Sequence, residues 1–284
     1  MPLPNHIRDF GSIVWGLKNW RKGDSLLHQK FDAFRDSDLA IEEFLQCPLW
    51  YLRNIGLKLI AHHHLEEHYG LFPEKLADLQ EAPIIRRNCA ATLRDLCLKS
   101  EQILAVLFSA LHDPYWEVRR EALVSLTDLY DYGNALGFRL LAATFDKSTV
   151  SLELELPIRP EPTHCKEPHF EVRAAIPPAL TKLVTGKLAL LALSHLANDP
   201  SWIVRFQTAV AVTRIANADP PLLHDCRNLL SQIEPCSHGA IHFFPLQQTL
   251  QKADAHLSKD TFDGLDGPID FLDPTKSWTT TIKD

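Results

Sequence analysis

The sequence is poor in glycine and has no long run of apolar residues. Its 284 residues include 11 glycines and 19 prolines, a balance that favours helical arrays, where proline marks the starts of helices. The most apolar window, 188–196, is far shorter than the ~20 residues that span a bilayer. The N-terminus, which reads Met1-Pro2-Leu3-Pro4, lacks the basic start and apolar stretch of a signal peptide. These absences predict a soluble cytoplasmic protein that does not associate with membranes.

Basic residues are also in the minority. The chain carries 29 Lys and Arg against 36 Asp and Glu, for a net charge of −7. A general nucleic-acid binder would show a basic excess or stripe, so the composition argues against that class. The cysteines form no Cys-x-x-Cys pair, which predicts small buried apolar residues in a reducing compartment. They lie at positions 47, 89, 97, 165, 226 and 236.

What the sequence has instead is a repeated pattern, Pro-x-aromatic-x-(Val/Leu/Ile)-Arg. Four full copies begin at Pro48, Pro114, Pro168 and Pro200, and a shortened copy reads Pro83-Ile84-Ile85-Arg86. The arginines stand at 53, 86, 119, 173 and 205, so the steps between them are 33, 33, 54 and 32 residues. A constant step of this size is the mark of stacked supersecondary units, each of which buries its apolar face against its neighbours.

Each unit is predicted to be a pair of helices. After the third arginine, Val118, Ala122, Leu126 and Leu129 follow the spacing of one helical face. Proline is expected in the first turn of this second helix, and Asp113 and Asp199, directly before it, are expected to cap it. Apolar-periodic runs that predict the first helices precede the copies at 38–46, 73–80, 101–112, 136–145 and 186–198.

The phrase Asp-Pro-x-Trp-x-Val-Arg, followed by an alanine-rich helix, resembles HEAT repeats, and in particular those of the phycobilisome-lyase type, the E/F-type phycobilin lyases. The resemblance covers about residues 37–217. It implies an all-α fold, a HEAT-like α-solenoid of five to six helical hairpins with terminal caps. It also implies that each repeated arginine pairs with an acidic group of a neighbouring hairpin, the alternative being a ligand clamp. The lyase relatives imply a bilin, a phycobiliprotein subunit and a heterodimer.

Four regions of one continuous domain are predicted. Residues 1–36 form an N-terminal helical cap or, alternatively, a docking arm with exposed tryptophans; residues 37–219 hold the repeats. An insert at 146–167 interrupts them, and its period-two alternation from Ser151 to Pro157 predicts a strand or an acidic arm. Residues 220–259 are capping helices. Residues 260–284 form an irregular acidic tail, either docked or disordered.

Pro177-Pro178 predicts a kink or a break in the second helix of the fourth unit.

Two clusters were weighed for chemistry. His64 and His68 have the i, i+4 spacing of a metal pair on one helical face. The alternative is that they belong to a polar helix end that enters a loop. His164 beside Cys165 could lower the pKa of the thiol. The alternative is that the two residues are adjacent by chance. Bilin isomerising lyases carry a His-Cys motif, but the flanking residues here do not match it. No catalytic residue, metal site or cofactor is predicted.

The resulting hypothesis is a non-catalytic scaffold that binds a partner protein or peptide on its concave face. The aromatic residues of the pattern are packing anchors or, if exposed, a row suited to a flat ligand or peptide. The alternative is a bilin lyase or chaperone that attaches or removes a phycobilin chromophore, with bilin as its ligand. A HEAT-type DNA glycosylase would require a basic groove. The candidate binding residues are Arg87, Trp116, Arg120, Glu121, His164, Cys165, Trp202, Arg205 and Phe206.

Overall fold

The computed structural model describes residues 41–130, 137, 139–141, 144, 165–184 and 186–233. Most of these residues are helical and no strand occurs among them, so the predicted all-α class is confirmed for this part of the chain. Within it, no helix combines the length and the apolar character needed to cross a membrane. The predicted N-terminal cap, nearly all of the insert, and the chain after residue 233 lie outside the described residues.

The helices alternate along the chain as predicted. Each copy of the pattern opens a long second helix: α4 (Trp50–His62), α6 (Pro83–Asp95), α8 (Trp116–Leu129), α11 (Phe170–Leu183) and α13 (Trp202–Ala218). The first helices are shorter: α3 (Ile41–Leu45), α5 (Leu71–Ala77), α7 (Glu101–Ala110) and α12 (Gly186–Ser194). Described residues between 137 and 144 are helical too. The 3-10 turns η1 (Glu66–His68) and η3 (Pro220–Leu222) precede α5 and α14 (Leu223–Gln232).

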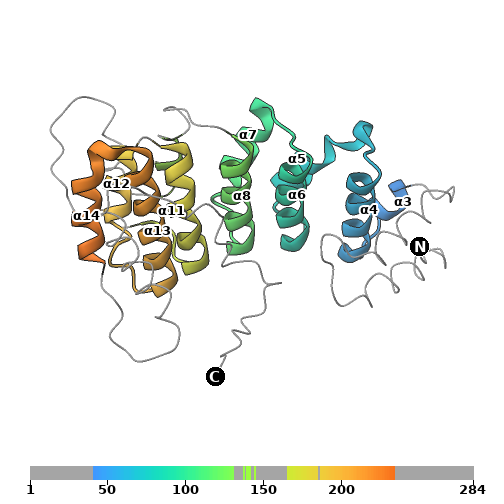
Figure 1. Ribbon diagram of the computed structural model, residues 1–284. Coiled ribbons are helices and arrows are strands. Elements are labelled where there is room, and N and C mark those ends of the chain that lie inside the picture. Colours follow the sequence, from blue (N-terminus) through green and yellow to red (C-terminus); the bar gives the residue numbers. More distant parts are fainter. Residues whose placement is uncertain are drawn as a thin grey trace, which may run out of the picture.

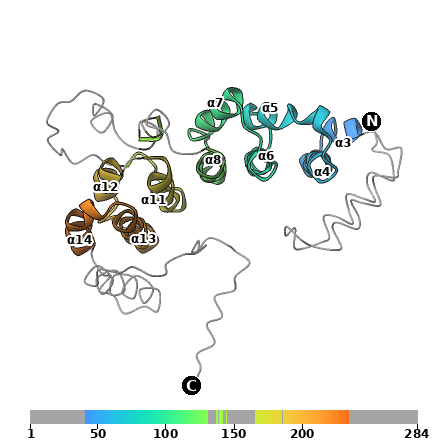
Figure 2. The same ribbon diagram turned by 45° about the horizontal axis from the view of Figure 1, so that its top comes forward.

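The two kinds of helix form two layers. Figure 1 shows α4, α6, α8 and α11 standing side by side in chain order, and α13 packs against α11. In Figure 2 the second helices lie along one side of the row, while α5, α7, α12 and α14 lie along the other. The face that periodicity predicted for α8 is buried, since Val118, Ala122 and Leu126 are fully buried. Gly56 permits a close approach, because a Cβ there would lie 2.9 Å from Phe44 Cβ.

The pattern residues take fixed places in the second helices. In α4, α8, α11 and α13 the aromatic residue is the first residue of the helix and the arginine is the fourth. α6 starts with Pro83 in the place of the aromatic residue, and Arg86 is again fourth. Elsewhere the proline lies in the turn, two residues before the helix, and not in its first turn as predicted.

The acidic residues before the prolines cap the turn, not the helix. Asp113 Oδ1 accepts a hydrogen bond from the backbone N–H of Tyr115 at 2.9 Å, and Asp199 Oδ1 accepts one from Ser201 N–H at 2.8 Å. Both donors precede the first helical residue, so the prediction of helix capping was wrong. Both oxygens of each carboxylate also accept hydrogen bonds from an arginine of the preceding second helix.

The structure decides two alternatives that the sequence left open. α11 runs unbroken through Pro177 and Pro178, so the predicted break is wrong; Pro177 is buried between apolar neighbours, and this packing offsets the two lost backbone donors. α4 ends at His62, His64 has a positive φ of 53°, and His68 belongs to η1, so the two histidines do not share a helical face. The described residues contain no group of side chains that could hold a metal ion.

Candidate binding surface

The first repeated arginine joins two consecutive hairpins. Arg53 Nε and Nη2 donate to the two carboxylate oxygens of Glu81, in the turn before α6, at 3.0 and 2.5 Å. Its Nη1 donates to the carbonyls of Cys47 and Pro48, in the turn before its own helix, at 2.7 and 2.9 Å. The guanidinium therefore closes its own turn with one nitrogen and holds the next turn with the other two.

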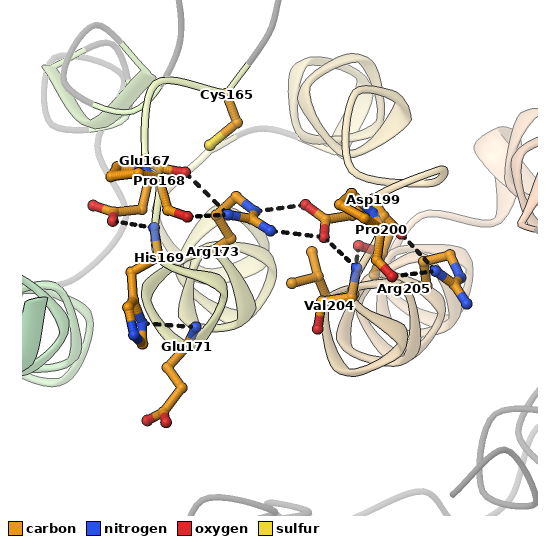
Figure 3. A network of polar contacts seen from close by, with 12 residues as sticks. Cys165, Glu167, Pro168, His169, Glu171, Arg173, Asp199, Pro200, Val204 and Arg205 are labelled. Carbon is orange, nitrogen blue, oxygen red and sulfur yellow. Dashed lines mark hydrogen bonds and ion pairs between the residues drawn. The ribbon is translucent and has the colours of Figure 1, made fainter. Parts of the chain in front are cut away.

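The next three arginines repeat this geometry. Each pairs through Nε and Nη2 with a carboxylate of the following turn and through Nη1 with its own turn carbonyls. Figure 3 shows Arg173 making both kinds of contact. The predicted arginine ladder is thus confirmed. Its pairs are Arg86–Asp113 at 2.7 and 2.9 Å, Arg119–Glu167 at 2.7 and 2.8 Å, and Arg173–Asp199 at 2.6 and 3.0 Å.

The ladder is strongly charge-stabilised. Hydrogen bonding to the partner carboxylate raises the pKa of Arg53, Arg119 and Arg173 against the opposing effect of burial. Burial would raise the pKa of Glu81, but hydrogen bonds from Arg53 and from the Ala82 N–H lower it below its usual value of 4.5. In these four arginines every guanidinium nitrogen is therefore engaged within the fold, which favours the ladder over a ligand clamp.

The fifth arginine differs from the other four. Arg205 Nη1 donates to the carbonyls of Asp199 and Pro200 at 2.5 and 3.2 Å, as its equivalents do (Figure 3). Its Nε is buried and has no hydrogen-bond partner in the described part of the chain. The ladder therefore holds this arginine on one side only.

A second set of polar side chains lies on the second helices, one residue beyond the ladder. Arg87, on α6, donates from Nε and Nη2 to Asn88 Oδ1 at 3.3 and 3.0 Å. Asn88 Nδ2 in turn donates to Asn54 Oδ1 of α4 at 2.9 Å. On α8, Arg120 Nε is buried without a partner among the described residues, and Arg120 Nη1 lies 4.0 Å from Glu121 Oε2.

Carboxylates lie close to some of these arginines and not to others. Towards the end of α6, Arg94 donates to Glu121 of α8 and lies 3.6 and 3.8 Å from the carboxylates of Asp95 and Asp128. Near the start of the same helices Arg87 and Arg120 make no hydrogen bond to a described carboxylate. Three carboxylates therefore surround Arg94, and one of them, that of Glu121, also lies beside Arg120.

Lys58 of α4 adds a third cation. Burial first, and then the nearby charge of Arg87, lower the pKa of Lys58 to about 8, while Asp95 acts in the opposite direction. The influence of Arg87 on this pKa shows that the α4 and α6 cations share one electrostatic environment. A bound anion would relieve this repulsion.

Aromatic rings gather where α8 meets α11. The Trp116 and His169 rings stack with their centroids 4.1 Å apart and an interplanar angle of 4°, and Phe170 lies 5.3 Å beyond His169. Tyr115 is 49% exposed and Phe170 38% exposed. An open hollow of about 220 Å³ is lined by Trp116, His169, Tyr115, Arg119, Pro114 and Pro168. Of the four pattern aromatics only Phe170 is exposed, and Trp50 and Trp202 pack against the core, so they form no exposed row along the repeats.

The structure brings together some of the predicted binding residues and separates others. Arg87, Arg120 and Glu121 share the α6–α8 face, and Trp116 lies at the start of α8. Trp202 is half-buried against the core, and Phe206, 2% exposed, belongs to it. Burial leaves Phe206 no surface for a partner.

The cysteines are free and mostly buried in the described residues, apart from the exposed Cys97. His164 lies outside the described residues. Cys165 Sγ donates to Thr144 O at 3.4 Å, and burial raises the pKa of its thiol to about 11. This direction is opposite to the activation considered from the His-Cys adjacency, so Cys165 is a protonated thiol at neutral pH.

Sequence reasoning missed three contributors to this surface: Asn54, Lys58 and His169. Asn54 is the α4 equivalent of Arg87 and Arg120, so alignment of the repeats could have found it. Nothing in the spacing predicted the Trp116–His169 stack, because the two residues belong to units that the insert separates. No protein-family model and no curated protein matches the chain.

Proposed function

We propose that the protein is a non-catalytic scaffold that binds an acidic segment of a partner protein on its second helices. In this proposal the hairpins form a HEAT-like solenoid, and the side lined by α4, α6, α8, α11 and α13 is its concave face. Arg87 and Arg120 are the principal binding residues, and Lys58 extends the cationic row onto α4. The free cysteines fit a reducing compartment such as the cytoplasm.

The observation that carries the proposal is the different environment of adjacent arginines. Arg86 and Arg119 direct their donors to ladder carboxylates and turn carbonyls. Among the described residues Arg87 donates to the neutral Asn88 side chain, and Arg120 keeps a buried Nε without a partner, with Glu121 at 4.0 Å from its Nη1. A partner carboxylate would supply charge-assisted hydrogen bonds to both, worth about 1.5–3 kcal/mol each.

Charge complementarity defines the partner. Arg87, Arg120 and Lys58 place positive charge on one side of the second helices, and this charge steers an acidic segment towards that side. The carboxylates around Arg94 disfavour the same acidic segment at the other end of α6 and α8. The bound segment should therefore be acidic where it contacts Arg87 and Arg120.

A peptide-selection experiment tests this proposal. A displayed library of random peptides is selected on the full chain, and the enriched sequences are synthesised with a fluorophore. We expect enriched peptides to contain clustered Asp and Glu, and the double variant Arg87→Glu, Arg120→Glu to bind them at least about tenfold more weakly. Fluorescence anisotropy measures the affinity, and circular dichroism verifies that the variant is folded.

Arg227→Glu is the matched control, because Arg227 is an exposed arginine on α14, in the other layer. It makes the same change in net charge per residue and should leave the affinity within about twofold. Equal loss of binding in both variants would reduce the effect to net charge. Selection of no sequence, or of peptides indifferent to Arg87 and Arg120, would refute the proposal.

The second candidate function is that of a bilin lyase or chaperone, because the repeat motif resembles that of the E/F-type phycobilin lyases. The observation that favours it is the open hollow beside the Trp116–His169 stack, because a flat conjugated ligand packs well on stacked rings. Phycocyanobilin mixed with the protein should then show a shifted visible absorption band that Trp116→Leu weakens. No spectral change with several bilins would remove this candidate.

A further inference from the structure

The hollow between the starts of α8 and α11 combines aromatic rings with hydrogen-bond donors. Trp116 and His169 line it with stacked rings whose centroids are 4.1 Å apart, and Tyr115, 49% exposed, lines it too. The hollow is open, and its volume of about 220 Å³ is below the roughly 300–1,000 Å³ of pockets that enclose a drug-sized molecule. Such a hollow suits one or two residues of an extended chain that continues beyond it.

The polar side-chain atoms of the hollow are mainly donors. His169 Nδ1 accepts a backbone N–H of α11 at 3.4 Å, so the proton of the neutral ring is on Nε2. The Trp116 indole only donates, and neither its N–H nor the Tyr115 hydroxyl has a hydrogen-bond partner among the described residues. The nearby carbonyl of Pro114 already accepts from Arg119. A ligand for this hollow should therefore supply acceptors and apolar rings.

A proline-rich segment has this chemistry. Proline carries no N–H, so such a segment exposes carbonyl acceptors without the matching donors, and its polyproline II conformation is already extended. Aromatic-lined grooves bind segments of this kind. Tyrosine and tryptophan suit them because each has an apolar ring for the proline and a polar group for a carbonyl.

Exposed apolar residues continue this site along the turns. In the part of the chain that the structure describes, the exposed large apolar side chains all lie in the turns before second helices or in the first two residues of those helices. They are Leu49, Leu79, Ile84, Tyr115 and Phe170. Packed helices are about 8–10 Å apart, and one turn of polyproline II spans about 9 Å. One turn of the segment therefore matches the step from one hairpin to the next.

Charge favours a basic residue in the segment. Glu117 and Glu171 are the second residues of α8 and α11. Neither carboxylate forms an ion pair with a described residue, and Figure 3 shows that of Glu171 directed away from the Arg173 contacts. Arg119, which also lines the hollow, is neutralised by Glu167. A lysine or arginine beside the prolines would therefore meet carboxylates that the described fold leaves without an ion pair.

We propose that the hollow between α8 and α11 binds a proline-rich segment of a partner protein that carries a lysine or arginine beside its prolines. The three aromatic side chains contact the prolines and their carbonyls, and the two glutamates receive the basic side chain. The inference uses neither Arg87 nor Arg120, so it does not rest on the proposed acidic segment.

A displayed library with a fixed Pro-x-x-Pro core and random flanks, selected on the full chain, tests this proposal. We expect enriched peptides to carry Arg or Lys in one flank, and a labelled copy with alanine in place of both prolines to bind at least about tenfold more weakly. Tyr115→Leu removes an exposed ring and Trp116→Phe an indole N–H, and each should weaken binding about five- to tenfold in fluorescence anisotropy. Circular dichroism verifies that the variants are folded.

Tyr130→Leu is the matched control, because Tyr130 lies at the opposite end of α8 from the hollow. It should leave the affinity within about twofold. The glutamates are tested against the charge of the peptide. Glu117→Gln and Glu171→Gln should each weaken binding about two- to fivefold, and this loss should disappear when alanine replaces the basic residue of the peptide.

Three results would overturn the inference. They are selection of no peptide, equal binding of the alanine-substituted copy, and wild-type affinity in both Tyr115→Leu and Trp116→Phe. Enrichment of acidic flanks in place of basic ones would refute the assignment of the glutamates. None of these results bears on the binding of an acidic peptide at Arg87 and Arg120, so the inference and the proposed function can fail separately.

Discussion

Two adjacent arginines on α6 show how one residue type serves two purposes. Arg86 is 1% exposed and donates to Asp113 of the next turn. Arg87 is half-buried and donates to the side chain of Asn88. On α8, Arg119 and Arg120 differ in the same way. Successive residues of a helix point about 100° apart, so one arginine meets the neighbouring hairpin while the next faces away from it.

The comparison separates stability from binding. The ladder position recurs in all five units, because every hairpin needs a connection to the next one. The following position holds arginine only on α6 and α8, and it is Asn54, Ala174 and Phe206 elsewhere. A feature confined to two adjacent units is typical of a local site, whereas a feature present in every unit reflects stacking.

The largest expected effect comes from removing one arginine of the α6 pair. Arg86→Met leaves the carboxylate of Asp113 buried without its partner and should lower the free energy of unfolding by about 3–5 kcal/mol. Arg87→Met should change it by less than about 0.5 kcal/mol. Urea denaturation followed by circular dichroism measures both. Equal losses for the two variants would show that the ladder is not the stabilising feature of the pair.

The second largest effect is expected from acid, which should weaken the ladder. The pKa of Glu81 is lowered in the folded protein, so its pair with Arg53 stabilises fully above the usual value of 4.5 and is lost as pH falls below it. Glu81→Gln should cost about 1–3 kcal/mol at pH 7 and should remove part of the acid dependence. Urea titrations at intervals of about one pH unit between pH 3 and pH 7 test this. Parallel pH curves for variant and wild type would contradict it.

The binding surface should respond without any loss of stability. Arg87→Ala and Arg120→Ala should each weaken binding of a selected acidic peptide by about three- to tenfold. Both should leave the free energy of unfolding within about 0.5 kcal/mol. Anisotropy titrations and urea curves on the same preparations provide the two measurements. If a variant loses stability in proportion to its loss of affinity, that arginine belongs to the fold and not to the binding surface.

The smallest expected effect is a pH dependence from Lys58. Its pKa of about 8 means that it loses its charge between about pH 7 and pH 9. Nearby Arg87 lowers this pKa and Asp95 raises it. Affinity for an acidic peptide should fall about two- to threefold over this interval. Lys58→Met should flatten that change.

A stability measurement checks the same titration. The unfolded chain holds the Lys58 proton up to its usual pKa of 10.5, so the free energy of unfolding should rise with pH between about 8 and 10.5. Lys58→Met should lack this rise. An affinity that stays constant from pH 7 to pH 9 in the wild type would place Lys58 outside the surface.

Much of the fold followed from the spacing of the repeated arginines. The second helices, and the first helices within a few residues, follow from it, whereas the arginine ladder was implied by the resemblance to HEAT repeats. Arg119 shows the limit, because its partner Glu167 lies 48 residues away, across the insert. The break predicted at Pro177 and Pro178 does not occur, because buried packing outweighs a local penalty.

The candidate site was less predictable than the fold. Arg87, Arg120 and Glu121 were identified from the repeats, but Glu121 proves to be the partner of Arg94. Phe206 was proposed for the surface and lies in the core. Periodicity gives the angle at which a side chain leaves its helix, yet whether that direction meets solvent or a neighbour depends on helices elsewhere in the chain.

The sequence by itself determined that helices would alternate and that each second helix would carry an arginine near its start, because both are local and periodic. Tertiary structure alone decided which carboxylate each arginine meets, which arginines keep donors for a ligand, and where Trp116 finds His169. Those outcomes depend on distances between hairpins, which are set when apolar faces pack together and not by spacing along the chain.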